Sequence, residues 1–280
     1  MGLVIMAASK SNDSYSIRIP KFSLKQNSYT PVLMVILLVA VFFLGRLTAQ
    51  VEYLKKGTTA TPTITTQAPN QPAAPTTDLN KIKALFSDGS IHFGDTNRKN
   101  LFVEFSDPSC PFCHIAGGLN PELNQQSGSQ FTLVSQGGKY VPPVEEMRKL
   151  VDSGNASFVW IYFPGHGNGE MGTKALYCAY EQGKFWEAHD KLMSNAGYSL
   201  LNNTVKNDTT KTADLVNFIG NVVDTGKLTD CLNSGKYNNK IASDTNLGST
   251  LGVQGTPGFY INSTYISGAM SWENMKTSVK

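Results

Sequence analysis

The residues of this chain whose spacing points most directly to chemistry are Cys110 and Cys113, in the segment LFVEFSDPSCPFCHIAGG. A C-x-x-C pair can be half of a metal site, a structural staple, or a redox couple that opens and closes as a disulfide. A four-cysteine zinc site needs a second close pair, whereas Cys178 and Cys231 lie far apart and have no histidine at ligand spacing. We therefore expect no metal site and favour the redox couple.

The sequence around the pair provides the geometry that a redox cysteine needs. The apolar run 101–105 predicts a strand, SDPS predicts a turn, and Cys110 then falls at the N-cap of a helix whose first turn holds Pro111. Unpaired backbone N–H groups and the helix dipole stabilise a thiolate at such a position and lower its pKa below about 8.5. We predict that Cys110 is the more accessible thiol with the lower pKa, and that Cys113 lies one turn inside.

The elements that must hold this turn in place follow from the apolar patterns. Residues 90–93 predict a short strand, and the unbroken apolar run 158–163 is typical of a central buried strand. Near the end of the chain, GFYIN and TYIS predict a hairpin, and Ser271 is a candidate N-cap of a closing helix.

Helices are predicted between these strands. In PVEEMRKLV the apolar residues fall on one helical face, and GTKALYCAYEQGKFWEAHDKLM and TADLVNFIGNVV predict further helices. This order of elements predicts an α/β fold with a helical insertion.

The N-terminal part has a different composition. An apolar run at 32–44, extended on both sides, is short for a membrane span of about 17–25 residues, but Arg46 can snorkel so that the next residues contribute. We expect an uncleaved anchor at 29–51. A cleaved signal peptide is the alternative, disfavoured by the long polar region ahead of the run and by the weak processing site in LTAQ.

The anchor divides the chain into four predicted parts. Basic residues are more numerous before the run than after it, which places the tail 1–28 in the cytoplasm. Residues 52–78 are a flexible linker rich in Thr, Pro and Ala, whose composition cannot bury enough apolar surface to fold. The folded domain is predicted at 79–280, on the extracytoplasmic side of the plasma membrane.

Overall composition excludes some partners. The net charge is only +3 and no Lys/Arg run carries interleaved aromatics, so we expect no nucleic-acid partner. The apolar content of 40% is ordinary for a globular protein. Four cysteines suit an oxidising compartment but are too few for a disulfide-stapled miniature scaffold.

Three segments together resemble the DsbA-like family of thioredoxin-fold oxidoreductases. FVEFSDPSCPFC resembles the family's active site and places Glu104 where thioredoxins carry a buried carboxylate. ALYCAYEQGKFWEAHDKL resembles the family's helical insertion, and GVQGTPGFYIN resembles its loop with a cis proline facing the C-x-x-C. The resemblance extends over residues 90–280 and implies a thioredoxin-like fold with a helical insertion.

The resemblance also implies roles for residues. Cys110 would be the nucleophile that forms mixed disulfides and Cys113 the buried resolving cysteine. Glu104 would assist proton transfer to and from Cys113, and Pro111 and Phe112 would tune the couple.

Three further residues receive expectations. Thr256 and Pro257 would form a cis bond whose loop exposes a backbone edge for an extended client peptide. His114 is interpreted as a first-turn helix residue, whose imidazolium would further favour the thiolate of Cys110.

The expected function is a membrane-tethered, extracytoplasmic thiol–disulfide oxidoreductase that donates the Cys110–Cys113 disulfide to exported proteins. No cofactor is implied, because the pair carries two electrons itself. The family resemblance implies a quinone-linked membrane protein as the reoxidant, and the absence of a dimerisation domain favours a monomer. A disulfide isomerase or reductase of the same fold is one alternative. A non-catalytic thioredoxin-fold binding module is the other.

Two features remain outside these roles. The stretch 120–139 is longer than the family's usual continuation, which leaves the rim of the active site undefined, and Ser263 stands where a glycine often closes the hairpin. We also predict that Cys178 and Cys231 form a structural disulfide, because an exported chain with free thiols beside a disulfide donor tends to be oxidised. Two unpaired buried cysteines are the alternative.

Overall fold

The computed structural model describes residues 76–87 and 89–280. The predicted tail 1–28, the anchor 29–51 and most of the linker 52–78 therefore lie outside the described residues. Within the part that is described, no helix is both long and apolar enough to cross a membrane.

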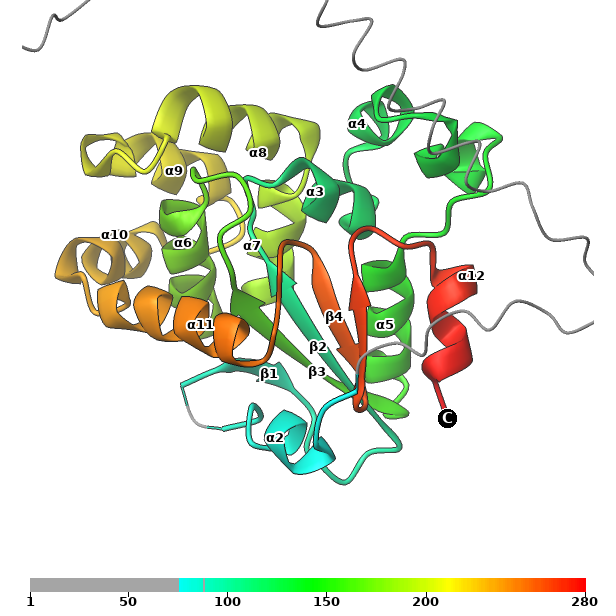
Figure 1. Cartoon of the computed structure of the whole chain (residues 1–280). Coiled ribbons are helices and arrows are strands. Elements are labelled where there is room, and N and C mark those ends of the chain that lie inside the picture. The colour runs from blue at the N-terminus through cyan, green and yellow to red at the C-terminus, as the bar shows by residue number, and fades with distance from the viewer. Residues whose placement is uncertain (1–75, 88) are drawn as a thin grey trace, which may run out of the picture. The chain divides into compact units, whose positions relative to one another are not determined.

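The centre of the domain is a five-stranded sheet in the order β1-β3-β2-β4-β5 (Figure 1). β2 and β3 pair in parallel, whereas β1 with β3, β2 with β4, and β4 with β5 pair antiparallel. Every residue of β2 and β3 is buried, which explains their near-continuous apolar sequences. All the predicted strands and the hairpin are present. The strands are β1 (Ile91–Phe93), β2 (Asn100–Ser106), β3 (Ala156–Tyr162), β4 (Gly258–Ile261) and β5 (Thr264–Ser267).

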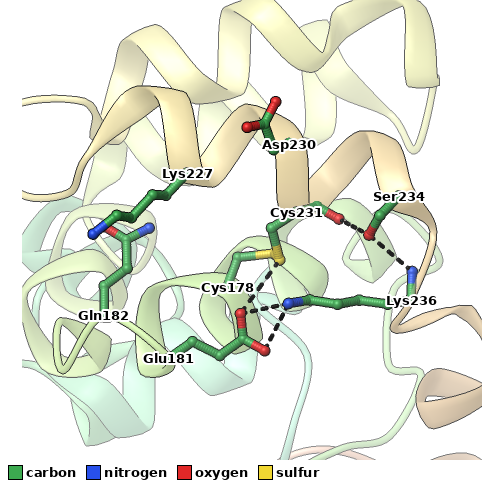
Figure 2. A pocket seen from close by; sticks show the side chains of 8 residues that line it. All are labelled: Cys178, Glu181, Gln182, Lys227, Asp230, Cys231, Ser234 and Lys236. Carbon is green, nitrogen blue, oxygen red and sulfur yellow. Dashed lines mark hydrogen bonds and ion pairs between the residues drawn. A yellow bond between two sulfur atoms is a disulfide. The ribbon is translucent and has the colours of Figure 1, made fainter.

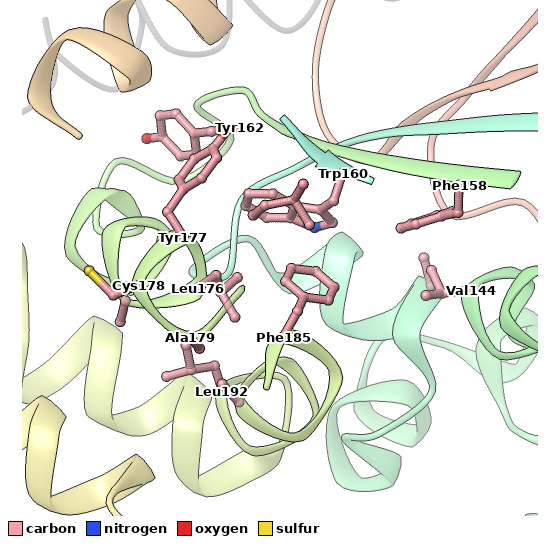
Figure 3. Close-up of a cluster of buried hydrophobic side chains, with 14 of the residues drawn as sticks. Val144, Phe158, Trp160, Tyr162, Leu176, Tyr177, Cys178, Ala179, Phe185 and Leu192 are labelled. Carbon is pink, nitrogen blue, oxygen red and sulfur yellow. The ribbon is translucent and has the colours of Figure 1, made fainter. Parts of the chain in front are cut away.

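The larger core lies on one face of the sheet, where Phe158 and Trp160 point toward helices (Figure 3), and Phe102 belongs to the same cluster. α5 (Pro143–Asp152) buries Val144, Met147 and Val151 here, three of the four apolar residues of its predicted face, and Leu150 packs at the margin. α6 (Glu170–Tyr180), α7 (Phe185–Leu192) and α12 (Trp272–Met275) complete this layer.

The opposite face carries a smaller core. Leu101, Val103 and Phe105 of β2 alternate with the residues that face the larger core, as the strand period of two requires. α2 (Leu79–Lys83) contributes Ile82 to this side, and α11 (Asn238–Thr250) packs along its margin through Leu247. Helices thus cover both faces of the sheet, as expected for an α/β fold with buried parallel strands.

The helical insertion occupies the chain between β3 and β4, from α6 to α11. The predicted helix starting at GTKALYC is two helices, α6 and α7, because the chain turns between them at Gly183, whose φ is +68°. The remaining elements are α8 (Asn195–Ser199), a π-helical turn at Leu200–Val205, a 3-10 turn at Thr209–Lys211, α9 (Thr212–Ile219) and α10 (Thr225–Ser234).

The stretch 120–139 is folded against α3 (Pro111–Gly117). It consists of α4 (Pro121–Gln126) and 3-10 turns at Ser129–Phe131 and Val134–Gln136. The side-chain amide of Asn124 donates to the carbonyls of Ile115, at 3.3 Å, and of Phe131, at 3.2 Å, and so ties the stretch to α3.

The closing helix begins where Ser271 predicts it, but the side chain of Ser271 caps no backbone N–H of α12. Its hydroxyl instead accepts a hydrogen bond from the backbone N–H of Val141, at 3.1 Å. A 3-10 turn at Lys276–Ser278 follows α12. The position of this N-cap was predicted correctly, whereas its side-chain bond serves a neighbouring segment.

Candidate active site

The cysteine pair lies at the point where β2 passes into α3. Cys110 is the N-cap residue of α3, with an extended backbone, and Pro111 occupies the first helical position. The missing N–H of proline costs nothing there, because the first helical N–H groups have no partner inside the helix. The turn is closed by the N–H of Cys110, which donates to the carbonyl of Asp107 at 2.9 Å.

Both thiols are buried, and they differ in their surroundings. The side chain of Cys110 is 3% exposed and that of Cys113 is 0% exposed. The thiol of Cys110 donates to the carbonyl of Thr256 at 3.5 Å, and the sulfur of Cys113 accepts from the N–H of Asp107 at 3.5 Å. Cys110 is thus the more accessible sulfur only by a small margin, which differs from the openly exposed thiol that its place at a helix terminus suggests.

The two cysteines have opposite pKa shifts. The pKa of Cys110 is lowered to about 7, chiefly because the thiol of Cys113 donates to its sulfur, and also because the backbone N–H groups of Cys113 and Phe112 point to it. Burial raises the pKa of Cys113 well above its ordinary value. Near neutral pH the pair can therefore hold a thiolate on Cys110 and a proton on Cys113, which is the division of roles between a nucleophilic and a resolving cysteine.

Glu104 lies inside the larger core. It pairs with Trp160 in the parallel register of β2 and β3, and its carboxylate oxygens are buried without a hydrogen-bond partner. Burial raises the pKa of Glu104, against opposing effects of the His189 charge and the Ser106 hydroxyl. The same hydroxyl lowers the pKa of Cys113, so Ser106 lies close to both groups, although its hydroxyl forms no hydrogen bond. Sequence analysis missed Ser106, although it lies on the same face of the strand as Glu104.

His114 does not act as a cation beside the thiolate. Its ring is fully buried, with Nδ1 2.8 Å from the carbonyl of Met193 and Nε2 2.9 Å from that of Pro108. Burial lowers the pKa of His114 to about 4. The expectation that an imidazolium at this position favours the thiolate is therefore wrong at neutral pH, because the ring is neutral there.

The loop before β4 faces the cysteines. The Thr256–Pro257 bond is cis, and Phe105 of β2 pairs with Gly258 of β4, which brings this loop beside Cys110. Phe112, between the two cysteines, is 47% exposed and contacts Phe131 edge to face. The stretch 120–139 therefore supplies part of the rim of the site.

Asp107 is a site residue that sequence analysis did not identify. Its carboxylate is fully buried and accepts hydrogen bonds from the N–H and the hydroxyl of Ser109, at 2.8 and 2.7 Å. The Asp-Pro-Ser order typical of such a turn was visible in the sequence. Its further partners, in the loop after β3, could not be read from it.

The second cysteine pair forms a disulfide on the helical insertion (Figure 2). Cys178 of α6 and Cys231 of α10 have Cα atoms 6.0 Å apart. Beside them is a pocket of about 460 Å³, where Glu181 binds Lys236 at 2.5 Å and accepts from the hydroxyl of Tyr237 at 2.6 Å. Among the described residues, no group of three His, Cys, Asp or Glu side chains is placed to hold a metal ion.

Comparison with protein families gives one match. Residues 143–280, just under half of the chain, match the family described as thioredoxin. The matched part includes Thr256 and Pro257 but begins after Cys110 and Cys113. The interpretation of the cysteine pair therefore depends on the geometry described above.

Solved structures of DsbA-like proteins share the fold. Oxidised BdbD from Bacillus subtilis is 15% identical, with a TM-score of 0.50, over 75% of this chain and 97% of that protein. The alpha-DsbA1 of Wolbachia pipientis is 18% identical, with a TM-score of 0.51, over 70% of this chain and 91% of that protein. These comparisons confirm the predicted resemblance, and the described domain has the thioredoxin-like fold of DsbA proteins, helical insertion included.

Curated relatives extend well beyond this chain. It is 26% identical over 181 residues to the Na(+)/H(+) antiporter NhaA 3 of Salinispora tropica, and 25% identical over 181 residues to NhaA 1 of Salinispora arenicola. Each alignment covers 63% of this chain and 22% of the relative. The chain thus spans about a fifth of the length of the curated relatives that it matches.

Proposed function

We propose that the protein is a thiol–disulfide oxidoreductase in which Cys110 exchanges disulfides with client proteins and Cys113 resolves them. The observation that carries this proposal is the split of the pair: the pKa of Cys110 is lowered to about 7 at the start of α3, while that of Cys113 is raised. A thiolate is the attacking and leaving species in disulfide exchange, so a pair with one stabilised thiolate is suited to that reaction.

The steps balance without a cofactor. A client thiolate attacks Cys110 of the oxidised pair, a client–Cys110 disulfide forms, and the Cys110–Cys113 bond breaks to leave a thiolate on Cys113. That thiolate takes a proton, for which Glu104 is the proposed buried donor, because its raised pKa favours the protonated carboxyl and Ser106 lies close to both groups. A second client thiolate then attacks the client sulfur of the mixed disulfide and releases Cys110 as a thiolate. The client gains a disulfide, and the pair gains two electrons and one proton, the latter on Cys113.

The backbone beside Thr256 is the proposed binding edge. Thr256 lies next to the reactive sulfur and immediately before β4, so an extended client can align its backbone there while its cysteine reaches Cys110. The exposed ring of Phe112 offers an apolar contact on the adjoining side. Pro111 and Phe112, in the first turn of α3, set how well the thiolate is stabilised.

The proposed setting is extracytoplasmic. The predicted anchor at 29–51 and linker 52–78 would keep the domain near the outer surface of the plasma membrane as a single-pass protein. Tethering there would raise the effective concentration of a quinone-linked membrane reoxidant. Exported proteins with cysteine thiols are the proposed clients, and the proposed unit is a monomer.

A second candidate, a reductase or isomerase of the same fold, is favoured by one observation. The pKa of Cys110, lowered to about 7, is close to the value of about 7 of thioredoxin and well above the value of about 3.5 of the oxidant DsbA. When the thiolate of Cys110 is less stabilised, the Cys110–Cys113 disulfide is less oxidising. The net direction therefore depends on the redox potential of the Cys110–Cys113 pair.

Equilibration of the full-length protein with glutathione buffers measures this potential. Mass mapping measures the fraction of the protein that carries the Cys110–Cys113 disulfide. The Cys178–Cys231 disulfide is mapped in the same samples for comparison. A potential nearer to about −120 mV supports donation of disulfides, and one near about −270 mV supports the reductase. A pair that does not exchange with glutathione at all would contradict both and support the non-catalytic binding module.

A further inference from the structure

The loop 164–169, between β3 and α6, lies directly against the reactive sulfur. A methyl group added at Gly165 would overlap the hydroxyl of Thr256 and would lie 3.1 Å from Cβ and 3.2 Å from Sγ of Cys110. Real Cβ atoms rarely come so close to their neighbours, so only a glycine lets the backbone pass here. Gly165 and Thr256 thus enclose Cys110 from two distant parts of the chain.

A buried carboxylate holds this loop in place. Oδ2 of Asp107 accepts hydrogen bonds from the N–H groups of Gly165, at 2.8 Å, and His166, at 3.0 Å. Oδ1 accepts the two bonds from Ser109, so one carboxylate joins the loop to the turn that carries Cys110. Hydrogen bonds to a charged acceptor are roughly twice as strong as neutral ones, and burial protects them from water.

Side-chain amides fix the rest of the loop. The hydroxyl of Ser109 accepts from the N–H of Asn168 at 3.2 Å, and the side chain of Asn202 bridges the side chain of Asn168 and the carbonyl of Ser109, at 3.0 Å each. The amide of Asn207 donates to the carbonyl of Gly167 at 2.8 Å. The loop is therefore attached both to the start of α3 and to the helical insertion.

We infer that the loop 164–169 is a fixed wall of the client groove, that Gly165 is a specificity-determining residue, and that Asp107 is the residue that positions it. The inference rests on the proposed function. With Cys110 only 3% exposed between Gly165 and Thr256, a thiolate must enter a narrow space. That space admits the cysteine of an extended, unfolded peptide aligned along Thr256, and it excludes thiols on the surface of folded proteins.

The test compares Gly165→Ala with Gly226→Ala in the full-length, oxidised protein. Gly226 lies in α10 on the helical insertion, and a methyl group there meets only Oδ1 of Asp224, at 3.3 Å, so this variant makes the same substitution away from the site. Rate constants for reduction by an unstructured cysteine peptide and by 2-mercaptoethanol are measured and expressed per thiolate of the reagent.

For Gly165→Ala we expect the peptide rate to fall at least about tenfold, since one added carbon in a tight pocket discriminates by roughly 10–200-fold. The rate with 2-mercaptoethanol should fall by much less, and Gly226→Ala should match the wild type with both reagents. Equal rates for the two variants with the peptide would contradict the inference that the loop 164–169 is a wall of the client groove. A wild-type protein that oxidises no peptide would instead contradict the proposed function.

Asp107→Asn tests whether Asp107 positions the loop 164–169. This variant also tests the inference if Gly165→Ala does not fold. Asn has only one acceptor oxygen, so either the N–H groups of Gly165 and His166 or the donors of Ser109 lose their acceptor. The link between the loop and the turn is then broken, and the loop should loosen and admit bulkier thiols. The rate of reaction with a folded protein that carries one surface cysteine should rise relative to the rate with the peptide. The pKa of Cys110 is measured in parallel, so that an altered thiolate can be distinguished from easier entry of the reagent to Cys110. Asp214→Asn, on the exposed side of α9, is the control. An unchanged ratio of the two rates would refute the role of Asp107.

Discussion

The thiol of Cys110 donates a hydrogen bond to the backbone carbonyl of Thr256 across 3.5 Å, although 146 positions separate the two residues in the sequence. The antiparallel pairing of β2 with β4 creates this proximity, because the strands place the turn after β2 beside the loop before β4. The reactive sulfur and the proposed binding edge thus lie just beyond the adjacent ends of two paired strands, and this pairing places them side by side.

The first prediction concerns alkylation of the reduced protein. Cys110 should react first with iodoacetamide, and its rate should rise with pH to half of its maximum near pH 7, because the pKa of Cys110 is lowered to about 7. Cys113 should react far more slowly, since burial raises its pKa. Mass mapping of samples quenched over time measures both. Faster labelling of Cys113 would reverse the assigned roles.

Mixed disulfides provide the second prediction. In Cys113→Ala the resolving thiol is absent, so client proteins should accumulate as disulfide-linked complexes with Cys110. In Cys110→Ala no such complexes should form, because burial raises the pKa of the remaining thiol and keeps it protonated near neutral pH. Non-reducing electrophoresis before and after addition of a reductant shows the difference. Complexes in the Cys110→Ala protein would mean that Cys113 is itself a nucleophile.

The third prediction is that Glu104→Gln stabilises the protein at pH 7 while slowing client oxidation. The free energy of unfolding should rise by about 1–3 kcal/mol, because at pH 7 folding must either protonate Glu104 or bury its charge without a hydrogen-bond partner, whereas a Gln amide is neutral in both states. The pKa of Glu104 is raised in the folded state. The penalty is therefore absent below the pKa of Glu104 in the unfolded state, and it grows as the pH rises through the pKa of Glu104 in the folded state.

Urea unfolding at pH 7 and at pH 4 measures this effect, with Glu122→Gln on the exposed side of α4 as the control. The stabilisation should shrink at pH 4, where the carboxyl group is protonated in both states. A destabilised variant at pH 7 would show that Glu104 has a stabilising partner in the folded protein.

The fourth prediction concerns acid stability and His114. Its folded-state pKa of about 4 lies below the ordinary 6.5, so the unfolded state binds the extra proton first. Stability should therefore fall as pH drops from about 6.5 toward 4, by up to about 3 kcal/mol from this residue. His114→Gln should lose less stability over that range, and His92→Gln, in β1, should behave as the wild type. Parallel losses for both variants would contradict the assignment.

The fifth prediction concerns the disulfide between Cys178 and Cys231. Replacing both by Ala should lower the free energy of unfolding by roughly 4 kcal/mol, because the bond closes a loop of about 54 residues and constrains the unfolded chain. The rate of client oxidation by Cys110 should change little, since the bond lies on the helical insertion. Unchanged unfolding in urea would mean that the bond is dispensable for stability.

Local patterns predicted the parts of the site that are coded locally. The strand before Cys110 and the N-cap position of Cys110 depend on residues close by in the sequence, and both are where the sequence predicts them. The cis Thr256–Pro257 bond, which the family resemblance implied, is also present. The burial of Glu104 was harder to predict, because a strand that alternates between two faces gives no sign of whether both faces are covered.

The features of the site that the sequence did not predict depend on contacts with other segments of the chain. Cys110 is nearly covered because Gly165 arrives from the loop after β3. Burial keeps the ring of His114 neutral, although the carbonyls of Met193 and Pro108 lie beside its nitrogens. Neither contact leaves a trace in the spacing of residues around C-x-x-C. The motif GHGNG reads as an ordinary flexible loop until Asp107 is seen to bind it.

The start of the described chain closes an otherwise open border of the sheet. Thr76 forms a β-bridge with Thr264 of β5, and the N–H of Thr77 donates to the carbonyl of Ser263 at 2.9 Å. These bonds occupy backbone groups at one end of an edge strand, where a foreign chain could otherwise pair and start aggregation. They also lie at the hairpin end of β4, about 13 Å along the strand from Pro257. The first described residues are thus tied to the end of β4 that lies away from the loop with Thr256.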